Sequence, residues 1–176
     1  KRSILNEGRI DSRYQANDLA NILTGNVGLK GAPHFMRPQQ AINYVECHDN
    51  ATFFDFLKVE DPNISEEVRQ AKARLGLHLV LLAQGVPFLH AGQEFYRSKG
   101  LEENTYNLPD ALNQLDWLSS TAYETDIQFL RELIAYRKEE ELLRFDKAQD
   151  IRDYCRVTWI SEKTFSYSIE KDGRKL

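Results

Sequence analysis

Hydrophobic residues recur at helical spacing in two stretches of the chain, and residues 1–38 show a weaker periodicity; together they predict three helices separated by polar loops. We expect a short helix near Tyr14–Leu23, a longer helix that begins after Ser65, and a third over roughly Tyr123–Glu140. Ser65 suits an N-cap, because its hydroxyl can accept a hydrogen bond from a free backbone N–H of the first turn. Gly85 suits the residue that directly follows the end of the central helix.

Two short apolar runs flank the central helix and are typical of buried strands. They are Ala41–Glu46 and Val86–His90, and a strand, helix, strand order is the unit that builds parallel sheets. From about Asp150 the hydrophobic period changes to two, through Phe165–Ile169, and residues 171–173 form a hairpin-turn signal. Only three residues follow this turn, so we expect the return strand to be missing. The sequence therefore predicts an α/β unit followed by the beginning of an antiparallel β domain.

Composition and charge exclude several classes of function. The 176-residue chain is 41% hydrophobic and 28% charged, which is ordinary for a globular protein. Its net charge of −4 and scattered Lys and Arg give no basic footprint for nucleic acid or for an anionic membrane surface. The longest apolar run, near Leu75–Leu89, is interrupted by polar residues and Pro, so no transmembrane span is expected. Cys47, placed in the first buried strand, and Cys155 make no disulfide framework and leave a secreted, cell-surface or cytoplasmic location open.

Both predicted strands of the α/β unit end in ionisable or amide side chains. His48, Asp49 and Asn50 follow the first strand, and His90 with Glu94 follows the second. The carboxyl ends of parallel strands carry the active sites of α/β barrels and open sheets. The polar segment after His90 also exceeds the usual length of a connecting loop, which is typical of functional loops. The sequence therefore predicts a site at this end of the sheet.

Each of these residues also has a purely structural interpretation. His48 is then a hydrogen-bonded strand-end residue, Asp49-Asn50 caps a short helix that begins near Phe53–Leu57, and Glu94 is a loop acid. His78 lies among leucines in the central helix and is interpreted as a packing residue. Taken singly, no residue establishes an enzyme.

A metal-dependent hydrolase is a competing interpretation. His48, Asp49, His90 and Glu94 are ligand types that suit zinc or iron. None of them sits at a recurrent ligand spacing such as HExxH, so no metal site is assigned; elemental analysis of the purified protein discriminates this alternative.

Several ordered motifs carry a resemblance to a known family. The stretches "INYVECHDN", "GVPFLHAGQEFYRSKG", "ENTYNLPD" and "NQLDW" resemble the type I pullulanases, debranching members of the α-amylase superfamily of glycoside hydrolases. The resemblance runs from about Asn21 to the end of the helix predicted at Tyr123–Glu140, and more loosely through the β segment.

The resemblance implies a (β/α)8 TIM barrel whose seventh strand lies near Ile42–Glu46 and whose eighth lies near Val86–His90. Residues 1–147 are then the C-terminal part of the catalytic barrel, and residues 148–176 begin an antiparallel β-sandwich domain. Carried over by motif, Asp49 is the carboxylate that stabilises the transition state, and His48 is a ligand of the sugar in the cleavage subsite. Additional substrate contacts are expected from four residues: Asn50, Tyr106, Asn107 and Asp110.

The implied activity is retaining hydrolysis of α-1,6-glucosidic branch linkages in pullulan, starch or glycogen-type glucans. The family's nucleophile and acid/base come from the fourth and fifth strands, which lie before Lys1, so we expect this chain to be a piece of a longer enzyme and inactive alone. Alternatives are an isoamylase-type debranching enzyme and a non-catalytic carbohydrate-binding module.

The expected partner is an α-glucan, with neither nucleic acid nor membrane. No cofactor is expected in this segment, and calcium elsewhere in the parent enzyme is left open. Exposed strand edges predict self-association of the isolated chain.

Overall fold

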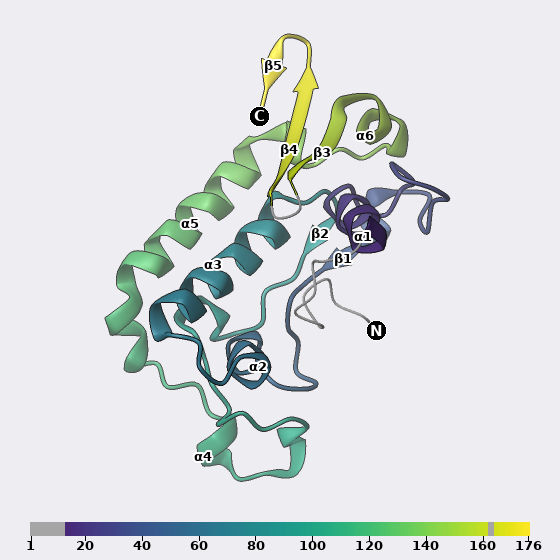
Figure 1. Cartoon of the computed structure of the whole chain (residues 1–176). Coiled ribbons are helices and arrows are strands. Elements are labelled where there is room, and N and C mark those ends of the chain that lie inside the picture. The colour runs from purple at the N-terminus through teal and green to yellow at the C-terminus, as the bar shows by residue number, and fades with distance from the viewer. Residues whose placement is uncertain (1–12, 162–163) are drawn as a thin grey trace. The chain divides into compact units, whose positions relative to one another are not determined.

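The computed structural model describes residues 13–161 and 164–176 and shows mixed α/β structure (Figure 1). The helices are α1 (Arg13–Leu23), α2 (Phe53–Glu60), α3 (Glu66–Leu82), α4 (Asp110–Asn113), α5 (Glu124–Glu139) and α6 (Ala148–Tyr154). The strands are β1 (Ile42–Asn43), β2 (Val86–Pro87), β3 (Cys155–Ser161), β4 (Thr164–Lys171) and β5 (Arg174–Lys175). Short 3-10 turns lie at Pro38–Gln40, Gln93–Phe95, Thr105–Asn107, Ser119–Tyr123 and Glu141–Leu143.

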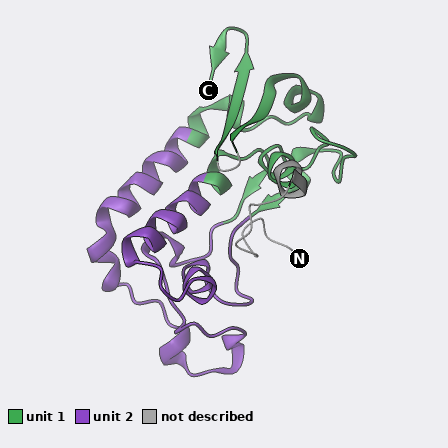
Figure 2. Cartoon of the chain, in the orientation of Figure 1, with its two compact units in different colours: residues 1–43, 79–88, 137–176 green, residues 44–78, 89–136 purple. Residues whose placement is uncertain are grey.

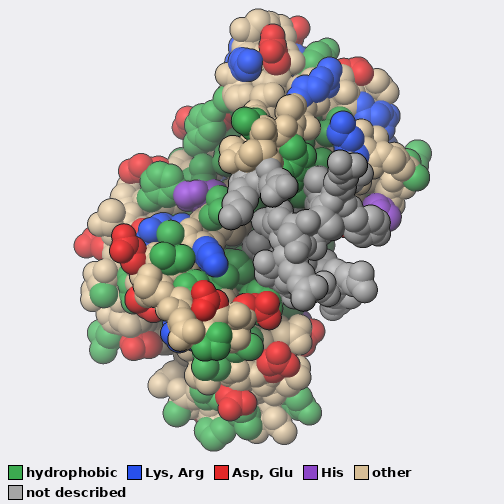
Figure 3. Space-filling model, in the orientation of Figure 1, with side chains coloured by type: hydrophobic (Ala, Val, Ile, Leu, Met, Phe, Trp, Pro, Cys, Tyr) green, Lys and Arg blue, Asp and Glu red, His purple; other side chains and the backbone are tan. Residues whose placement is uncertain are grey.

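The chain divides into two compact units, each built from segments that are distant in the sequence (Figure 2). Unit 1 comprises the described part of residues 1–43, residues 79–88 and residues 137–176. Unit 2 comprises residues 44–78 and 89–136. On the face shown in Figure 3, acidic side chains are scattered among side chains of other kinds. No helix among the described residues is long and apolar enough to cross a membrane.

The parallel strand pair of unit 1 confirms the predicted strand, helix, strand order, but both strands are shorter than predicted. Ile42 pairs with Val86 and Asn43 with Pro87, in place of the expected Ala41–Glu46 and Val86–His90. Pro87 has no N–H to donate to the ladder, which limits the pairing at this point. The side chains of Ile42 and Val86 are exposed among the described residues, so the first strand is not the fully buried one expected.

The junction between α3 and β2 depends on a close backbone approach at Gly85. Its φ is +102°, and a Cβ there would lie 2.9 Å from the carbonyl oxygen of Ala41. Gly85 was expected directly after the helix, yet α3 ends at Leu82, so this glycine serves the entry to β2 instead. The helix end is closed by the buried guanidinium of Arg137, which donates hydrogen bonds to the carbonyl oxygens of residues 81, 83 and 85.

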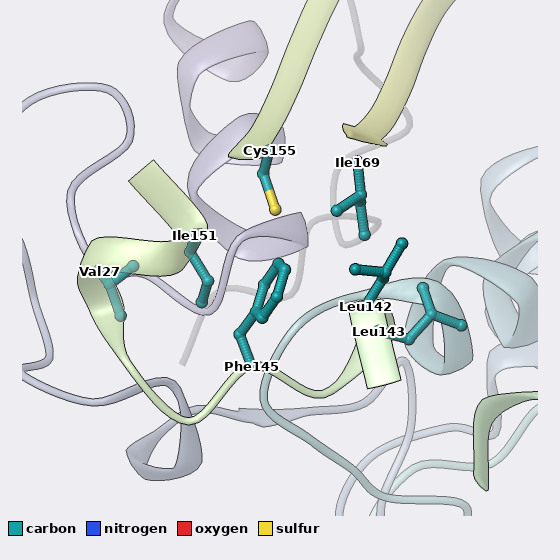
Figure 4. Packing of buried hydrophobic residues seen from close by; sticks show 7 residues of the cluster. All are labelled: Val27, Leu142, Leu143, Phe145, Ile151, Cys155 and Ile169. Atoms are coloured by element: carbon teal, nitrogen blue, oxygen red, sulfur yellow. The ribbon is translucent and has the colours of Figure 1, made fainter. Parts of the chain in front are cut away.

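Unit 1 has an apolar core next to the antiparallel sheet (Figure 4). Its buried members, contributed by segments at both ends of the chain, are Val27, Leu142, Leu143, Phe145, Ile151, Cys155 and Ile169. The buried amide of Gln84 lies in the same unit, where it donates to the Leu142 carbonyl oxygen at 2.7 Å and accepts from the Phe145 N–H at 3.0 Å.

The antiparallel sheet has the order β3-β4-β5, and Cys155 pairs with Ile169 at one end of its main ladder. The sequence placed the change to period two near Asp150, but residues 148–154 form α6 and the strand begins at Cys155. Ile151 is completely buried, so one face of α6 joins the core before the chain becomes extended. The predicted turn is confirmed, because Asp172 and Gly173 both have positive φ, as a type I′ hairpin requires. The expectation of a missing return strand is wrong, since Arg174 and Lys175 form β5 and pair with β4.

Unit 2 contains α2, most of α3 and most of α5. Ser65 acts as predicted, because its Oγ accepts the Val68 N–H at 3.3 Å at the start of α3. Further along, α3 packs closely against the start of α2, since a Cβ on Gly76 would lie 2.8 Å from the ring of Phe53. His78 packs its ring against Phe129 at 5.1 Å, and this burial, together with the Arg74 charge, lowers the pKa of His78.

Candidate functional site

The predicted site residues His48 and Asp49 lie on a bend of unit 2 rather than at the end of a regular strand. The side chain of His48 is 85% exposed and that of Asp49 is 52% exposed, and His48 Nε2 lies 3.5 Å from Asp49 Oδ1. No other partner of either side chain is present among the described residues. Asn50 follows with φ of 65°, a left-handed conformation that Asn tolerates better than most residues. Both functional groups are therefore accessible to a ligand.

The structural interpretation of Asp49-Asn50 as a helix cap is wrong. The N-cap of α2 is Thr52, whose hydroxyl accepts the Asp55 N–H at 3.1 Å. The exposure of the His48 ring likewise leaves no packing role for it within the described residues. Cys47 is partly exposed, in contrast to the buried strand position expected for it.

A buried carboxylate closes the loop that carries these residues. Glu46 Oε2 accepts the backbone N–H of Phe53 at 2.5 Å, which ties the two ends of the loop together. Glu46 Oε1 lies 3.0 Å from His90 Nδ1, and because an ionised carboxylate only accepts, the imidazole donates here. The side chain of Glu46 is 2% exposed, so these bonds are shielded from water. This contact joins the segments that follow β1 and β2.

A second buried carboxylate anchors the polar loop after β2. Asp55 has no exposed surface, and it accepts hydrogen bonds from Ser98 Oγ and from the Lys99 N–H, both at 2.6 Å. Arg69 Nη2 lies 3.3 Å from the same carboxylate. The guanidinium of Arg69 is itself fixed over the ring of Phe54 at 3.5 Å. A charged network thus holds the loop against α2 and α3.

The remaining predicted substrate contacts lie on the 3-10 turn Thr105–Asn107 and at the start of α4. Tyr106 is 88% exposed, and Asn107 and Asp110 are also exposed. Asn113 supports the turn from behind: its Nδ2 donates to the Thr105 carbonyl oxygen, and its Oδ1 accepts from Thr105 Oγ1, both at 2.7 Å. The turn therefore exposes the side chains of Tyr106 and Asn107 on a backbone that Asn113 holds in place.

Comparison with known proteins gives the site a family context. The pullulanase of Bacillus subtilis is 38% identical over 148 residues, covering 84% of this chain and 21% of the relative. A pullulanase from Paenibacillus barengoltzii, solved in complex with maltohexaose and α-cyclodextrin, superposes with a TM-score of 0.85 at 36% identity, covering 96% of this chain and 27% of that structure. The chain is homologous to a segment of the pullulanases.

This pullulanase-like chain spans about a fifth of the Bacillus subtilis relative and about a quarter of the solved structures it matches. The isoamylase of a Flavobacterium species is a further relative, 35% identical over 133 residues, which cover 61% of this chain and 17% of the isoamylase. No family model matches the chain.

The four residues weighed as metal ligands are not brought together in the pullulanase-like chain. His90 is hydrogen-bonded to Glu46. Glu94 accepts a hydrogen bond from the Gly92 N–H at 2.9 Å, which stabilises the turn in which Glu94 lies. Among the described residues, no group of three or more His, Cys, Asp or Glu side chains is arranged to hold a metal ion.

Unit 1 has a pocket of about 370 Å³ that contains none of the predicted site residues. Its lining is mainly charged and of both signs, and comprises Glu141, Leu142, Arg144, Phe145, Asp146, Asp150, Lys171, Asp172 and Arg174.

Sequence reasoning missed the residues that support the site from within: Glu46, Asp55 and Lys99. Thr52 and Asp55 match a capping-box pattern, and one of its hydrogen bonds forms, from the Asp55 N–H to the Thr52 hydroxyl. The carboxylate of Asp55, however, turns to the loop after β2. Nothing in the local sequence marks Lys99 as buried, since lysine is mostly exposed in proteins.

Proposed function

We propose that this chain is the C-terminal part of the catalytic (β/α)8 barrel of an α-1,6-glucan hydrolase, followed by the start of a β-sandwich domain. In this proposal β1 and β2 belong to the seventh and eighth strands, and the domain boundary lies between residues 147 and 148. Support comes from the parallel pairing of β1 with β2, from the antiparallel sheet β3-β4-β5, and from the likeness to pullulanase structures.

The observation that carries the functional proposal is the accessible His48-Asp49 pair on a loop fixed by buried charges. In a retaining glycosidase the transition state resembles an oxocarbenium ion, so an ionised carboxylate near the sugar ring stabilises it. Asp49 takes this role, and the His48 imidazole binds a sugar hydroxyl. Asn50, Tyr106, Asn107 and Asp110 supply further contacts to the α-glucan.

The nucleophile and the acid/base are proposed to come from residues outside these 176. A retaining mechanism needs two carboxylates about 5 Å apart across the scissile bond. Among the described residues no second carboxylate pairs with Asp49, which forms its ion pair with His48. The proposed reaction is catalysed by carboxylates, so the proposal includes no cofactor bound to this chain.

The substrate class is inferred from relatives. The Bacillus subtilis pullulanase was solved with maltose and an Anoxybacillus pullulanase with maltotetraose. We therefore assign α-glucan chains as the ligand. The isoamylase relative supports a second candidate specificity, branch points of glycogen-type glucans, which the ratio of rates on pullulan and glycogen distinguishes.

The test uses the complete enzyme, meaning the protein encoded by the whole reading frame that contains this chain. We expect it to release reducing sugar from pullulan, and we expect the isolated 176 residues to release none above a buffer blank. Asp49→Asn in the complete enzyme should lower kcat by about 100-fold or more, since a preorganised transition-state charge is lost.

Asp146→Asn is the matched control for charge, because Asp146 is exposed and has no role in the proposed site. Near-normal turnover of Asp49→Asn contradicts the role of Asp49. A reading frame without a further Asp and Glu at barrel strand ends contradicts the enzyme and favours a carbohydrate-binding module.

A further inference from the structure

Lys99 is a buried cation that connects the two segments carrying the predicted substrate contacts. Its side chain is 2% exposed, although it lies in a polar loop. Its Nζ donates to the backbone carbonyl oxygen of Asn50 at 3.3 Å and to Thr105 Oγ1 at 3.2 Å. The first acceptor belongs to the residue after Asp49, and the second to the residue before Tyr106.

Both acceptors of the Lys99 ammonium are neutral, and no ion pair joins Nζ to a carboxylate among the described residues. Burying a charge without an opposite charge is costly to the folded state, so packing alone gives no reason for a lysine here. Methionine fills a similar volume without that cost. What the ammonium contributes, and an apolar side chain lacks, is donors that reach two separate segments at once.

The acceptor at Asn50 is a sensitive position. Asn50 has positive φ, so the peptide groups around it have a less favourable conformation that its surroundings must maintain. The side chains of His48 and Asp49 are exposed, and among the described residues the ion pair they form is with each other. Their orientation therefore depends on the backbone, and the bond from Lys99 fixes that backbone one residue away from Asp49.

The other end of the link is equally well held. Thr105 Oγ1 donates its proton to Asn113 Oδ1 at 2.7 Å, which leaves its lone pairs to accept from Lys99. The backbone N–H of Lys99 is bound to the buried carboxylate of Asp55. The lysine is thus anchored at its main chain while its ammonium spans the two segments.

We propose that Lys99 is a positioning residue that sets the geometry of Asp49 relative to the turn bearing Tyr106 and Asn107. This inference rests on the proposed hydrolysis of α-glucans, in which Asp49 acts in the transition state. A displacement of about 1 Å in a catalytic group can cost about 100-fold in rate. Removing the ammonium should release the Asn50 peptide and allow a displacement of this kind.

The test is Lys99→Met in the complete enzyme, with Lys72→Met as the matched control, because Lys72 is exposed on α3. Lys99→Met should lower kcat on pullulan by about 10- to 100-fold and leave KM within about threefold, since an interaction effective mainly in the transition state is weakened. Lys72→Met should leave both constants within about twofold of the wild type.

A double-mutant cycle separates positioning from general damage. If Lys99 acts through Asp49, adding Lys99→Met to Asp49→Asn should change kcat by no more than about twofold. If the lysine only supports the fold, the two losses multiply, and the positioning role is wrong. Should Lys99→Met fail to fold, Thr105→Val decides. At nearly constant shape it removes the acceptor of Lys99, together with the donor to Asn113 Oδ1, and it should lower kcat about tenfold through the same cycle.

The outcomes distinguish this inference from the function on which it rests. Failure of the wild-type complete enzyme to hydrolyse any α-glucan overturns both. An active wild type in which Lys99→Met matches Lys72→Met overturns the positioning role and leaves the function intact. A reduced kcat with little change in KM and no further loss in the Asp49→Asn background supports the role.

Discussion

Asp55→Asn is expected to be among the most destabilising single-atom changes in unit 2. The carboxylate has no exposed surface and makes three contacts: Ser98 Oγ and the Lys99 N–H at 2.6 Å, and Arg69 at 3.3 Å. An amide retains one acceptor oxygen but presents an NH2 group in place of the other. Either Ser98 or the Lys99 N–H then loses its acceptor, and Arg69 loses its buried counter-charge.

The magnitude follows from these contacts. Breaking a buried ion pair by neutralising one partner costs about 3–5 kcal/mol, because the other charge stays desolvated. With a urea slope of about 2 kcal/mol per molar, the midpoint of unfolding should fall by about 2 M. Such a loss is a large fraction of the about 5–15 kcal/mol that stabilises a typical domain.

The chain contains its own control for this change, because Arg69 also pairs with Glu66 at 3.5 Å. The Glu66 side chain is 58% exposed, so its pair with Arg69 is screened by water and Glu66→Gln should cost less than about 1 kcal/mol. Urea unfolding of both variants, followed by circular dichroism, compares a buried and an exposed partner of one arginine. Equal midpoints for the two variants would refute the argument that burial makes Asp55 important.

Three further predictions concern other parts of the fold. Gly85→Ala should destabilise the chain by about 1–3 kcal/mol in urea unfolding, because its φ is +102° and the new Cβ would meet a carbonyl oxygen at 2.9 Å. Iodoacetamide at pH 8 should modify Cys47 well before Cys155, since burial removes Cys155 from solvent and raises its pKa to about 11; mass spectrometry of a time course checks the order. Because the pKa of His78 lies below its ordinary 6.5 in the folded state, the unfolded state binds protons more readily and stability should fall as the pH drops from 7 to 5. His78→Gln should reduce that fall in urea midpoints, and an unchanged difference between the two pH values would contradict the assignment.

The helices were predictable because their signals are local. The helices predicted at Tyr14–Leu23 and Tyr123–Glu140 match α1 and α5 closely, although the periodicity of the first is weak, and Ser65 caps α3 as expected. The strands were less predictable, since the extent of β1 and β2 depends on a partner distant in the sequence and on the missing N–H of Pro87. The residues before β3 show the same limit: Ile151 is buried on a helix, and its apolar character alone did not distinguish helix from strand.

The position of the candidate site could likewise be predicted from a local signal, but the buried residues that support the site could not. His48, Asp49 and Asn50 stand out because polar groups directly follow an apolar run. Glu46, Asp55 and Lys99 are residue types that usually lie on the solvated surface. All three are nevertheless buried, and each is hydrogen-bonded to a residue more than forty positions away in the sequence. Only the folded arrangement shows that these charges face inward.

This division between exposed and buried groups has a consequence for how the site works. The groups proposed to meet the sugar have few protein contacts of their own, so their geometry is set by the backbone beneath them. That backbone is fixed by two charge-assisted hydrogen bonds: Glu46 accepts one from the Phe53 N–H, and Lys99 donates one to the Asn50 carbonyl oxygen. Such bonds are stronger than neutral hydrogen bonds and have a defined geometry. Substitutions at these buried positions should therefore alter turnover without touching the substrate, whereas substitutions at exposed positions such as Tyr106 should alter KM first. The two classes of variant separate ligand contact from preorganisation, and the proposed site requires both.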